Sequence, residues 1–183
     1  MKELTLKNTV GADLAELWAI HIHPEVAPHQ YRIRKGVSLL DKILRLGELD
    51  SVEGLILKTL RIESNIVGYI LTVQADSGEI RVAQSGWSLH PRYWGNGIMT
   101  NAMTHHLREL FGEQNRTHVL ADCFVNNHRC KRLLDRLGFV PWQYPISDRI
   151  FRMWFSRSLK WENRYGITKQ SWGKLEARRI TGR

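Results

Sequence analysis

The sequence predicts a mixed α+β fold, and two observations support this prediction. The spacing of apolar residues is helical near the N-terminus and changes to strand-like alternation between residues 53 and 89. From residue 80 onward, strand-like and helical segments alternate. The resulting order is neither a strict βαβ alternation nor all-β. An antiparallel meander that leads into a parallel crossover implies a mixed sheet flanked by helices.

The first half of the chain is predicted to contain one strand, two helices and a meander of three strands. Leu4 and Leu6 alternate with polar residues, as in an edge or half-buried strand. Leu14, Leu17 and Trp18 share one helical stripe. The predicted segments are a strand at 2–9, helices at 12–22 and 37–49, and strands at 53–61, 65–75 and 80–89.

The second half is predicted to alternate between helix and strand and to end in two strands. Gly112 and Gly138 each follow a helical segment. Both are predicted C-caps, because glycine readily adopts the left-handed conformation that ends many helices. The predicted segments are helices at 98–111 and 127–137, and strands at 117–125, 140–144 and 150–156.

Composition narrows the class of protein. The 183 residues suffice for one domain with a real core. No apolar run approaches the roughly 20 residues that cross a bilayer, so no membrane partner is expected. Cys123 and Cys130 are too few for a disulfide scaffold and are expected to be reduced thiols in a cytoplasmic protein. The histidines lack a convergent pattern with supporting carboxylates, so no metal is expected.

The formal net charge of +9 is concentrated at the C-terminal end. Residues 157–183 contain eight Lys or Arg against two Glu, which is +6 of the total. The predicted organisation is one domain at 1–156 and a basic extension at 157–183. Trp161, Tyr165 and Trp172 indicate that part of this extension packs on the domain. Its charge suits an acidic or RNA/ribosomal partner, and the alternative is a solvated terminal segment.

A glycine-containing loop between the strand at 80–89 and the helix at 98–111 is the main functional signal. Residues 92–97 read R-x-x-G-x-G. Glycine permits close backbone approach, and the unpaired amides at a helix start attract anions, so the loop suits a phosphate. Glycines that merely form the turn are the alternative. No Lys follows Gly97 and no third glycine stands at Thr100, which excludes a P-loop and a dinucleotide fingerprint.

Three features of the sequence resemble the GNAT superfamily of N-acetyltransferases, in particular its RimJ/RimL-type branch. One is the R-x-x-G-x-G loop, and another is the run G-W-S-L-H-P-R-Y-W-G-N-G at residues 86–97. The third is N-H-R-C at 127–130, followed by leucines and Leu137-Gly138-Phe139. Together with the order of elements, they make the resemblance cover roughly residues 1–156.

The resemblance implies a central, mostly antiparallel sheet of about seven strands flanked by about four helices, splayed between strands four and five. It also implies acetyl-CoA as cosubstrate, with its pyrophosphate on the loop amides and its pantetheine arm along the end of strand four. In this family the amine attacks the thioester directly in a ternary complex. The cofactor-binding residues that the resemblance implies are Trp87, Ser88, Leu89, Arg92, Trp94, Gly95, Asn96, Gly97, Ile98 and Asn127.

The chain departs from the family at two catalytic positions. Gln84 stands where strand four often carries a glutamate, and an amide can orient a water or the substrate but cannot act as a base. Cys130 replaces the serine of N-x-x-S, and its thiol is a candidate proton donor to the leaving thiolate. A packing role and a covalent nucleophile are the alternatives for Cys130. His90, Asp122 and Glu53 are the candidate bases, among which His90 is favoured because it ends strand four and a neutral imidazole suits the task. The alternatives are a loop position in contact with solvent or phosphate for His90, the start of a strand for Glu53 and a bond to backbone for Asp122.

The expected function is acetyl-CoA-dependent acetylation of a primary amine on a protein N-terminus, an amino acid or a small amine. Residues 22–49 and the Pro145 loop are expected to form the acceptor wall, and basic residues within it favour an acidic or phosphate-bearing acceptor. The alternative function is a CoA-binding or RNA/ribosome-associated module with little catalysis. The residues singled out in this basic part of the wall are His29, Tyr31, Arg32, Arg34 and Lys35.

Overall fold

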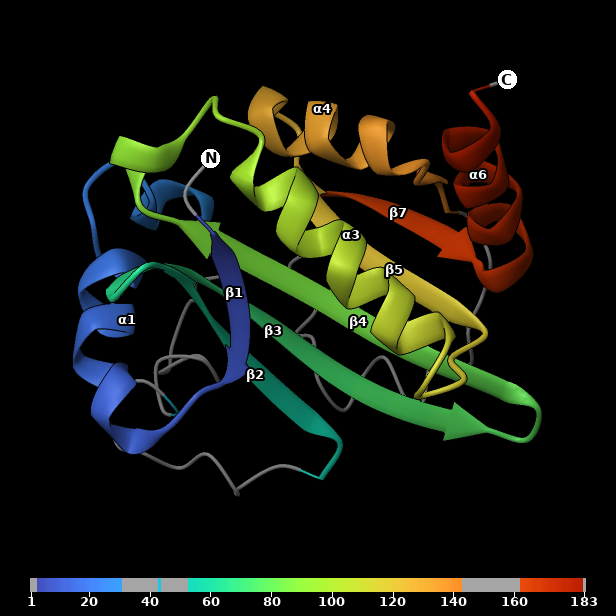
Figure 1. The fold of residues 1–183 in the computed structure, drawn as a ribbon, viewed down its shortest axis with the longest axis horizontal. Helices are drawn as coiled ribbons and strands as arrows, with labels where there is room; N and C mark the ends of the chain where they lie inside the picture. The colour runs from blue at the N-terminus through green and yellow to red at the C-terminus, as the bar shows by residue number, and fades with distance from the viewer. Residues whose placement is uncertain (1–2, 31–42, 44–52, 143–161, 183) are drawn as a thin grey trace. The chain divides into compact units, whose positions relative to one another are not determined.

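A computed structural model describes residues 3–30, 43, 53–142 and 162–182 (Figure 1). The chain divides into two compact units. The first unit comprises residues 1–73 and 85–103, and the second comprises 74–84 and 104–183. The strands form one seven-stranded sheet in the order β1-β2-β3-β4-β5-β7-β6. This mixed α+β architecture confirms the predicted fold class.

The first unit begins with three strands joined in antiparallel pairs. Strand β1 (Leu4–Asn8) pairs with β2 (Leu55–Ile62), which pairs with β3 (Asn65–Ser77). Ile62 lies opposite Asn65, so β2 and β3 form a tight hairpin at the predicted turn. The 3₁₀ helix η1 (Gly11–Asp13) precedes helix α1 (Leu14–His21), and η2 (Ala27–His29) follows it.

The core of the first unit is the predicted stripe of α1 packed on the hairpin. Leu17 is completely buried, and Trp18 packs partly buried at the edge. The predicted helix at 37–49 lies outside the described residues, except for its buried Ile43. The buried members of this cluster are Leu14, Leu17, Ile20, Ile43, Leu57, Ile66 and Tyr69. Removal of this apolar surface from water, at about 25 cal/mol per Å², favours folding.

Strand β4 (Ile80–Leu89) and helix α3 (Ile98–Phe111) have the predicted bounds, and each contributes residues to both units. Strand β3 reaches the turn before β4, where Gly78 has a φ of +60°. The 3₁₀ helix η3 (Pro91–Tyr93) lies in the connection between β4 and α3. Local signals, namely strand alternation, turn glycines and a helical stripe, therefore sufficed to define this part of the chain.

The second unit contains the parallel crossover. Strand β5 (His118–Phe124) pairs in parallel with β4 from Val82 opposite His118 to Gln84 opposite Leu120. The paired positions end there, although β4 continues to Leu89 and β5 to Phe124. This short ladder agrees with the expected divergence of strands four and five. Helix α4 (His128–Leu137) follows β5 and ends at Gly138, whose φ of +81° confirms the predicted C-cap.

The segment beyond residue 156 contributes a strand and a helix that the sequence analysis did not predict. Strand β7 (Glu162–Thr168) pairs antiparallel with β5 along its whole length and also with β6 (Val140–Pro141) (Figure 1). Helix α6 (Lys169–Thr181) follows directly. Tyr165 and Ile167 are buried, so β7 is an integral strand of the sheet. The strand predicted at 150–156 lies outside the described residues, as does the remainder of the strand predicted at 140–144.

A close packing contact explains Gly166 in β7. A methyl group at this position would lie 2.5 Å from the indole of Trp142, which follows β6. The Trp142 backbone amide donates to the carbonyl of Arg164 at 2.9 Å, and its ring meets His118 edge-on at a centroid distance of 5.4 Å. The aromatic side chain therefore packs closely against β7. No helix among the described residues is long and apolar enough to cross a membrane.

Candidate cofactor and catalytic site

The loop between β4 and α3 requires both of its glycines. Gly95 has a φ of +81° and Gly97 a φ of +73°, in the left-handed region that side chains disfavour. Both glycines and Asn96 are exposed. Nothing lies within 4 Å of the position that a Cβ would take at either glycine. The glycines therefore serve the backbone conformation and leave the outer side of the loop open to a ligand.

Hydrogen bonds from the loop's own side chains hold this conformation. The Trp94 indole Nε1 donates to the Leu89 carbonyl at 2.7 Å, and Asn96 Nδ2 donates to the Trp94 carbonyl at 3.2 Å. The first helical bond of α3 joins the Asn101 amide to the Gly97 carbonyl at 3.0 Å. The amides of Ile98 and Met99 precede this bond, so no carbonyl of the helix accepts from them. The start of α3 thus offers backbone donors at the positive end of the helix dipole.

The end of β4 lies tightly against β3. The His90 amide donates to the Val67 carbonyl at 2.8 Å, and a methyl group on Gly68 would lie 2.3 Å from the Ser88 carbonyl oxygen. Ser88 is buried, and its hydroxyl accepts a hydrogen bond from Gln30 Nε2. These contacts fix the backbone of 87–89, the stretch for which pairing with a pantetheine arm is predicted.

His90 is a cap in this structure. Its Nδ1 accepts a hydrogen bond from the Arg92 amide at 3.2 Å and so caps η3. Partial burial, together with the nearby His23 and Arg92, lowers the pKa of His90 below 6.5, which keeps the ring neutral at pH 7. A neutral ring whose Nδ1 accepts must carry its proton on Nε2. In this arrangement His90 can donate a hydrogen bond but cannot accept the amine's proton, unless the bond to Arg92 breaks.

A second histidine lies beside His90. The rings of His23 and His90 meet edge to face at a centroid distance of 5.2 Å, and Tyr93 lies 6.2 Å from His90 on the same measure. His23 Nδ1 likewise accepts from a backbone amide, that of Glu25, at 3.2 Å. The segment that follows α1 is thus brought next to the end of β4 at His23. Arg92 itself is exposed, as a residue that contacts a phosphate from solvent must be.

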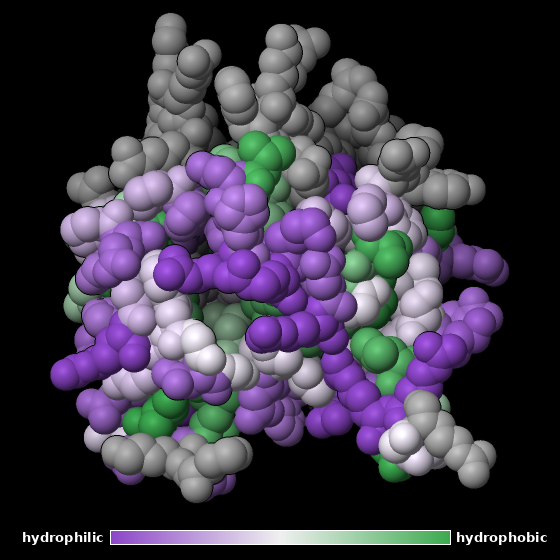
Figure 2. Space-filling view, turned by 90° about the horizontal axis from the view of Figure 1, so that it is seen from above, coloured by the Kyte–Doolittle hydropathy of each residue, from purple (hydrophilic) through white to green (hydrophobic). Residues whose placement is uncertain are grey.

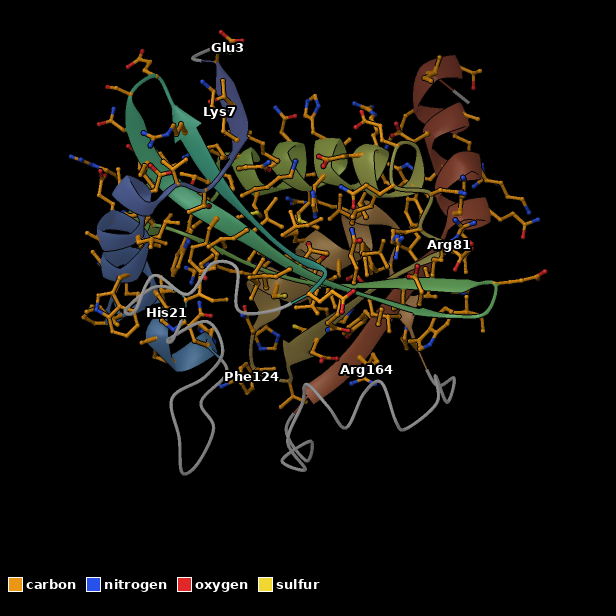
Figure 3. All side chains as sticks on the ribbon, turned by 90° about the horizontal axis from the view of Figure 1, so that it is seen from below. Glu3, Lys7, His21, Arg81, Phe124 and Arg164 are labelled. Carbon is orange, nitrogen blue, oxygen red and sulfur yellow. The ribbon has the colours of Figure 1, made fainter. Side chains whose placement is uncertain are left out.

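In the second unit, Gln84 lies against a carboxylate. Gln84 Nε2 donates to Asp122 Oδ2 at 3.2 Å, and Arg164 Nε donates to Asp122 Oδ1 at 3.0 Å. Arg164 is labelled on its strand in Figure 3. The three side chains come from the neighbouring strands β4, β5 and β7, and the Asp122 side chain is only 9% exposed. Burial raises the pKa of the Asp122 carboxyl, and the ion pair with Arg164 opposes this rise.

The start of α4 joins Asn127 and Cys130. Asn127 Oδ1 accepts from the Cys130 amide at 3.0 Å, which makes Asn127 the N-cap of the helix. The Cys123 thiol lies 3.6 Å from the Asn127 carbonyl, to which it donates. Cys123 beside Cys130, together with burial, raises the pKa of the Cys130 thiol. Cys130 therefore retains its proton at neutral pH, which disfavours a thiolate nucleophile, while the raised pKa makes the thiol a weaker acid than an exposed cysteine.

Among the contacts between described residues, Asp122 is the candidate base that touches another predicted catalytic residue, Gln84. Glu53 is exposed. Arg164 was not singled out from the sequence, because it falls in the predicted extension and reaches Asp122 only through the pairing of β5 and β7. Tyr31, Arg32, Arg34 and Lys35 of the predicted acceptor wall lie outside the described residues. In the described part of the chain, no three metal-ligating side chains converge.

Comparisons with known proteins agree with this architecture. A family model for an acetyltransferase (GNAT) domain matches residues 3–140. No curated protein matches the sequence as a relative. Among solved structures, a ribosomal-protein-S5-alanine acetyltransferase from Vibrio fischeri has 16% identity and a TM-score of 0.70, with 94% of this chain and 96% of that chain covered.

Two further solved structures are similar to the same extent. A spermidine/spermine N-acetyltransferase from Vibrio cholerae has 15% identity and a TM-score of 0.70, covering 94% of this chain and 98% of that chain. An aminoglycoside acetyltransferase solved in complex with coenzyme A also has 15% identity and a TM-score of 0.70, with 95% and 99% covered. Identities this low support a shared fold and do not identify an acceptor.

Proposed function

Because the chain belongs to the GNAT acetyltransferase family, we propose that it transfers an acetyl group from acetyl-CoA to a primary amine by direct attack in a ternary complex. The observation that supports this most is the open loop with two left-handed glycines at the start of α3. The run at residues 86–97 favours the RimJ/RimL-type branch.

The described residues fit acetyl-CoA in two places. The amides from Gly95 to Ile98, with the exposed Arg92 beside them, would hold the pyrophosphate. Asn127 uses its Oδ1 for the helix cap, which leaves Nδ2 to donate to the pantetheine arm. When bound, acetyl-CoA would supply an activated thioester. Cys130, with its thiol protonated, would supply a proton to the departing sulfur.

Binding of acetyl-CoA by calorimetry tests the cofactor assignment. Gly97→Glu puts a carboxylate where the pyrophosphate is proposed and strains a left-handed position, so we expect the affinity to fall by at least about tenfold. Gly11→Glu is the matched control, because Gly11 is exposed, lies in open space and is remote from the loop in sequence. Undiminished binding by Gly97→Glu would refute the loop assignment.

The acceptor is proposed to be an amine that carries a negative charge, such as an acidic peptide N-terminus or a phosphate-bearing amine. The support is the basic composition of residues 29–35. A screen of primary amines, in which release of the CoA thiol is measured, identifies the acceptor class. We expect acidic acceptors to be used more efficiently than spermidine. Efficient acetylation of spermidine would contradict this proposal.

A second candidate function, association with RNA, is supported by the exposed charge on α4 and α6. The C-terminal part of α6 lies against the end of α4, where Arg179 Nη2 donates to the Arg136 carbonyl at 2.9 Å. The acidic residues of these helices are neutralised: Asp135 by Lys131 at 2.8 Å and Glu176 by Arg108 at 2.6 Å. Hydrophilic side chains cover much of the side on which α4 and α6 are drawn (Figure 2).

Four exposed basic side chains, which we term the α4–α6 basic face, pair with no acidic group among the described residues. They are Arg132, Arg136, Lys174 and Arg178. Arginine side chains bind phosphates in a forked geometry, and each such contact makes affinity more sensitive to salt.

Anisotropy with a labelled single-stranded RNA at increasing salt concentration tests this candidate. Arg132→Gln and Arg178→Gln are each expected to weaken binding and reduce the salt slope by about one. Lys7→Gln, an exposed lysine on β1, is the control that should change neither. RNA binding that is weak and that neither arginine variant changes would rule out the α4–α6 basic face as an RNA-binding surface.

A further inference from the structure

The carboxylate that is absent from position 84 of β4 is present on the neighbouring strand. Asp122 Oδ2 accepts a hydrogen bond from Gln84 Nε2 at 3.2 Å. Gln84 lies opposite Leu120, so Asp122 is two residues further along β5, on the same face of the sheet as Leu120. A glutamate at position 84 would therefore place its carboxylate within hydrogen-bond distance of the Asp122 carboxylate.

We propose that Asp122 is the proton acceptor of the acetyl transfer, and that Gln84 and Arg164 are the residues that position it. This inference rests on the proposed N-acetyltransferase function. As the amine lone pair forms the bond to the acetyl carbon, one proton on the amine nitrogen passes to Asp122. The carbon–sulfur bond breaks with its electron pair on sulfur, which then takes a proton from Cys130 or water. Asp122 and Cys130 return to their starting states by exchange with solvent.

The surroundings of Asp122 suit this task. Arg164 Nε donates to Oδ1 at 3.0 Å and Gln84 donates to Oδ2, so the carboxylate is held at both oxygens. Each oxygen has a further lone pair with which to accept. Burial raises the pKa of the carboxyl, which makes Asp122 a stronger base than an exposed aspartate, while Arg164 favours the ionised form. His90 Nδ1, in contrast, already accepts a hydrogen bond from the Arg92 amide.

Asp122→Asn tests the proposal directly, because the amide has nearly the same size but cannot accept a proton. With the best amine from the acceptor screen, we expect kcat to fall by about 10²–10⁴-fold while acetyl-CoA affinity is unchanged. Asp135→Asn is the matched control: Asp135 is exposed on α4 and pairs with Lys131. It should retain the wild-type kcat. Thermal unfolding of each variant verifies that the protein is folded.

A carboxylate exchange separates chemistry from structure. Gln84→Glu combined with Asp122→Asn moves the carboxylate to β4 and keeps the hydrogen bond, with donor and acceptor reversed. We expect the double variant to recover at least about tenfold of the kcat lost in Asp122→Asn. A purely structural role for Asp122 would give no recovery, since the double variant still lacks the ion pair with Arg164.

The pH profile supplies an independent readout. The charged group described beside Asp122 is Arg164 on β7, and its neighbour from β4 is the neutral Gln84. kcat/KM should fall as the pH falls through the raised pKa of Asp122. This acidic limb of the pH profile should disappear in Asp122→Asn. Arg164→Gln removes the charge that favours ionisation, so the limb should move to higher pH.

Two failures are distinguishable. If the wild-type protein binds acetyl-CoA but acetylates no amine in the screen, the proposed function fails and this inference fails with it. If the wild type is active and Asp122→Asn keeps its kcat, only the inference on Asp122 is overturned. Loss of acetyl-CoA binding or of folding in Asp122→Asn, without recovery in the double variant, would likewise reject it in favour of a structural role.

Discussion

Gly68 in β3 illustrates how one residue positions the predicted cofactor strand. A methyl group there would lie 2.3 Å from the Ser88 carbonyl oxygen and 3.1 Å from Leu89 Cα, both backbone atoms that cannot rotate away. We therefore expect Gly68→Ala to lower the free energy of unfolding by about 1–3 kcal/mol. Because the displaced strand leads into the glycine loop, acetyl-CoA affinity should fall as well. Urea unfolding and calorimetry measure the two effects.

A second glycine provides the control for Gly68. Gly86 lies on β4 and is exposed, and a methyl group there would meet nothing within 4 Å. Gly86→Ala should leave the free energy of unfolding unchanged or slightly higher, because alanine restricts the unfolded chain more than glycine does. If both variants lose the same stability, the close approach of β3 and β4 does not explain why position 68 holds a glycine.

At the scale of the element, α4 is delimited by residues visible in the sequence. Asn127 caps its start through Oδ1, and Gly138 ends it in the left-handed conformation. Asn127→Ala should cost about 1 kcal/mol of stability, measured by urea unfolding, because the Cys130 amide loses its acceptor. Asn127→Asp retains the cap but loses the Nδ2 donor, so it should unfold like the wild type.

The same pair of variants separates the two roles of Asn127. If Nδ2 anchors the pantetheine arm, Asn127→Asp should bind acetyl-CoA more weakly despite its intact helix cap. Equal acetyl-CoA affinity in Asn127→Asp and the wild type would restrict Asn127 to capping. Unfolding of Asn127→Asp at lower urea than the wild type would contradict the cap assignment itself.

At the scale of the whole molecule, histidines in both units make stability depend on pH. Burial lowers the pKa of His118 below 6.5. The pKa of His90 is also lowered, mainly by burial and by the nearby His23. Below pH 6.5 the unfolded chain thus binds these protons more readily than the folded chain, so stability present above that pH is lost as the pH falls. We expect the unfolding midpoint to drop between about pH 7.5 and 5.5.

Substitution at one histidine tests this dependence. His118→Gln removes one of the two groups and should flatten the curve of unfolding midpoint against pH. His128→Gln, at an exposed position on α4, should leave the curve unchanged. The raised pKa of Asp122 acts in the opposite sense, since it favours the folded state at acidic pH and loses that effect as pH rises. A curve that stays equally steep in His118→Gln would contradict the assignment.

Much of the fold and of the cofactor loop was predictable, because it depends on interactions close in sequence. The bounds of β4 and α3 and the cap at Gly138 follow from alternation, helical spacing and glycine conformations. The pair of left-handed glycines at 95 and 97 was visible as a motif. The bond from the Arg92 amide to His90 Nδ1 was not predicted, and the role of His90 as a base stays a prediction.

The sequence by itself determined the fold class, the family and the loop that suits a phosphate, since each depends on local backbone preferences and short motifs. Only the tertiary structure decided that the basic C-terminal segment supplies β7 beside β5, and that Asp122 lies between Gln84 and Arg164. The physical reason is sequence separation: Gln84 is 38 residues and Arg164 is 42 residues from Asp122. Such contacts depend on which strands pair and in what register, and no local pattern specifies that choice.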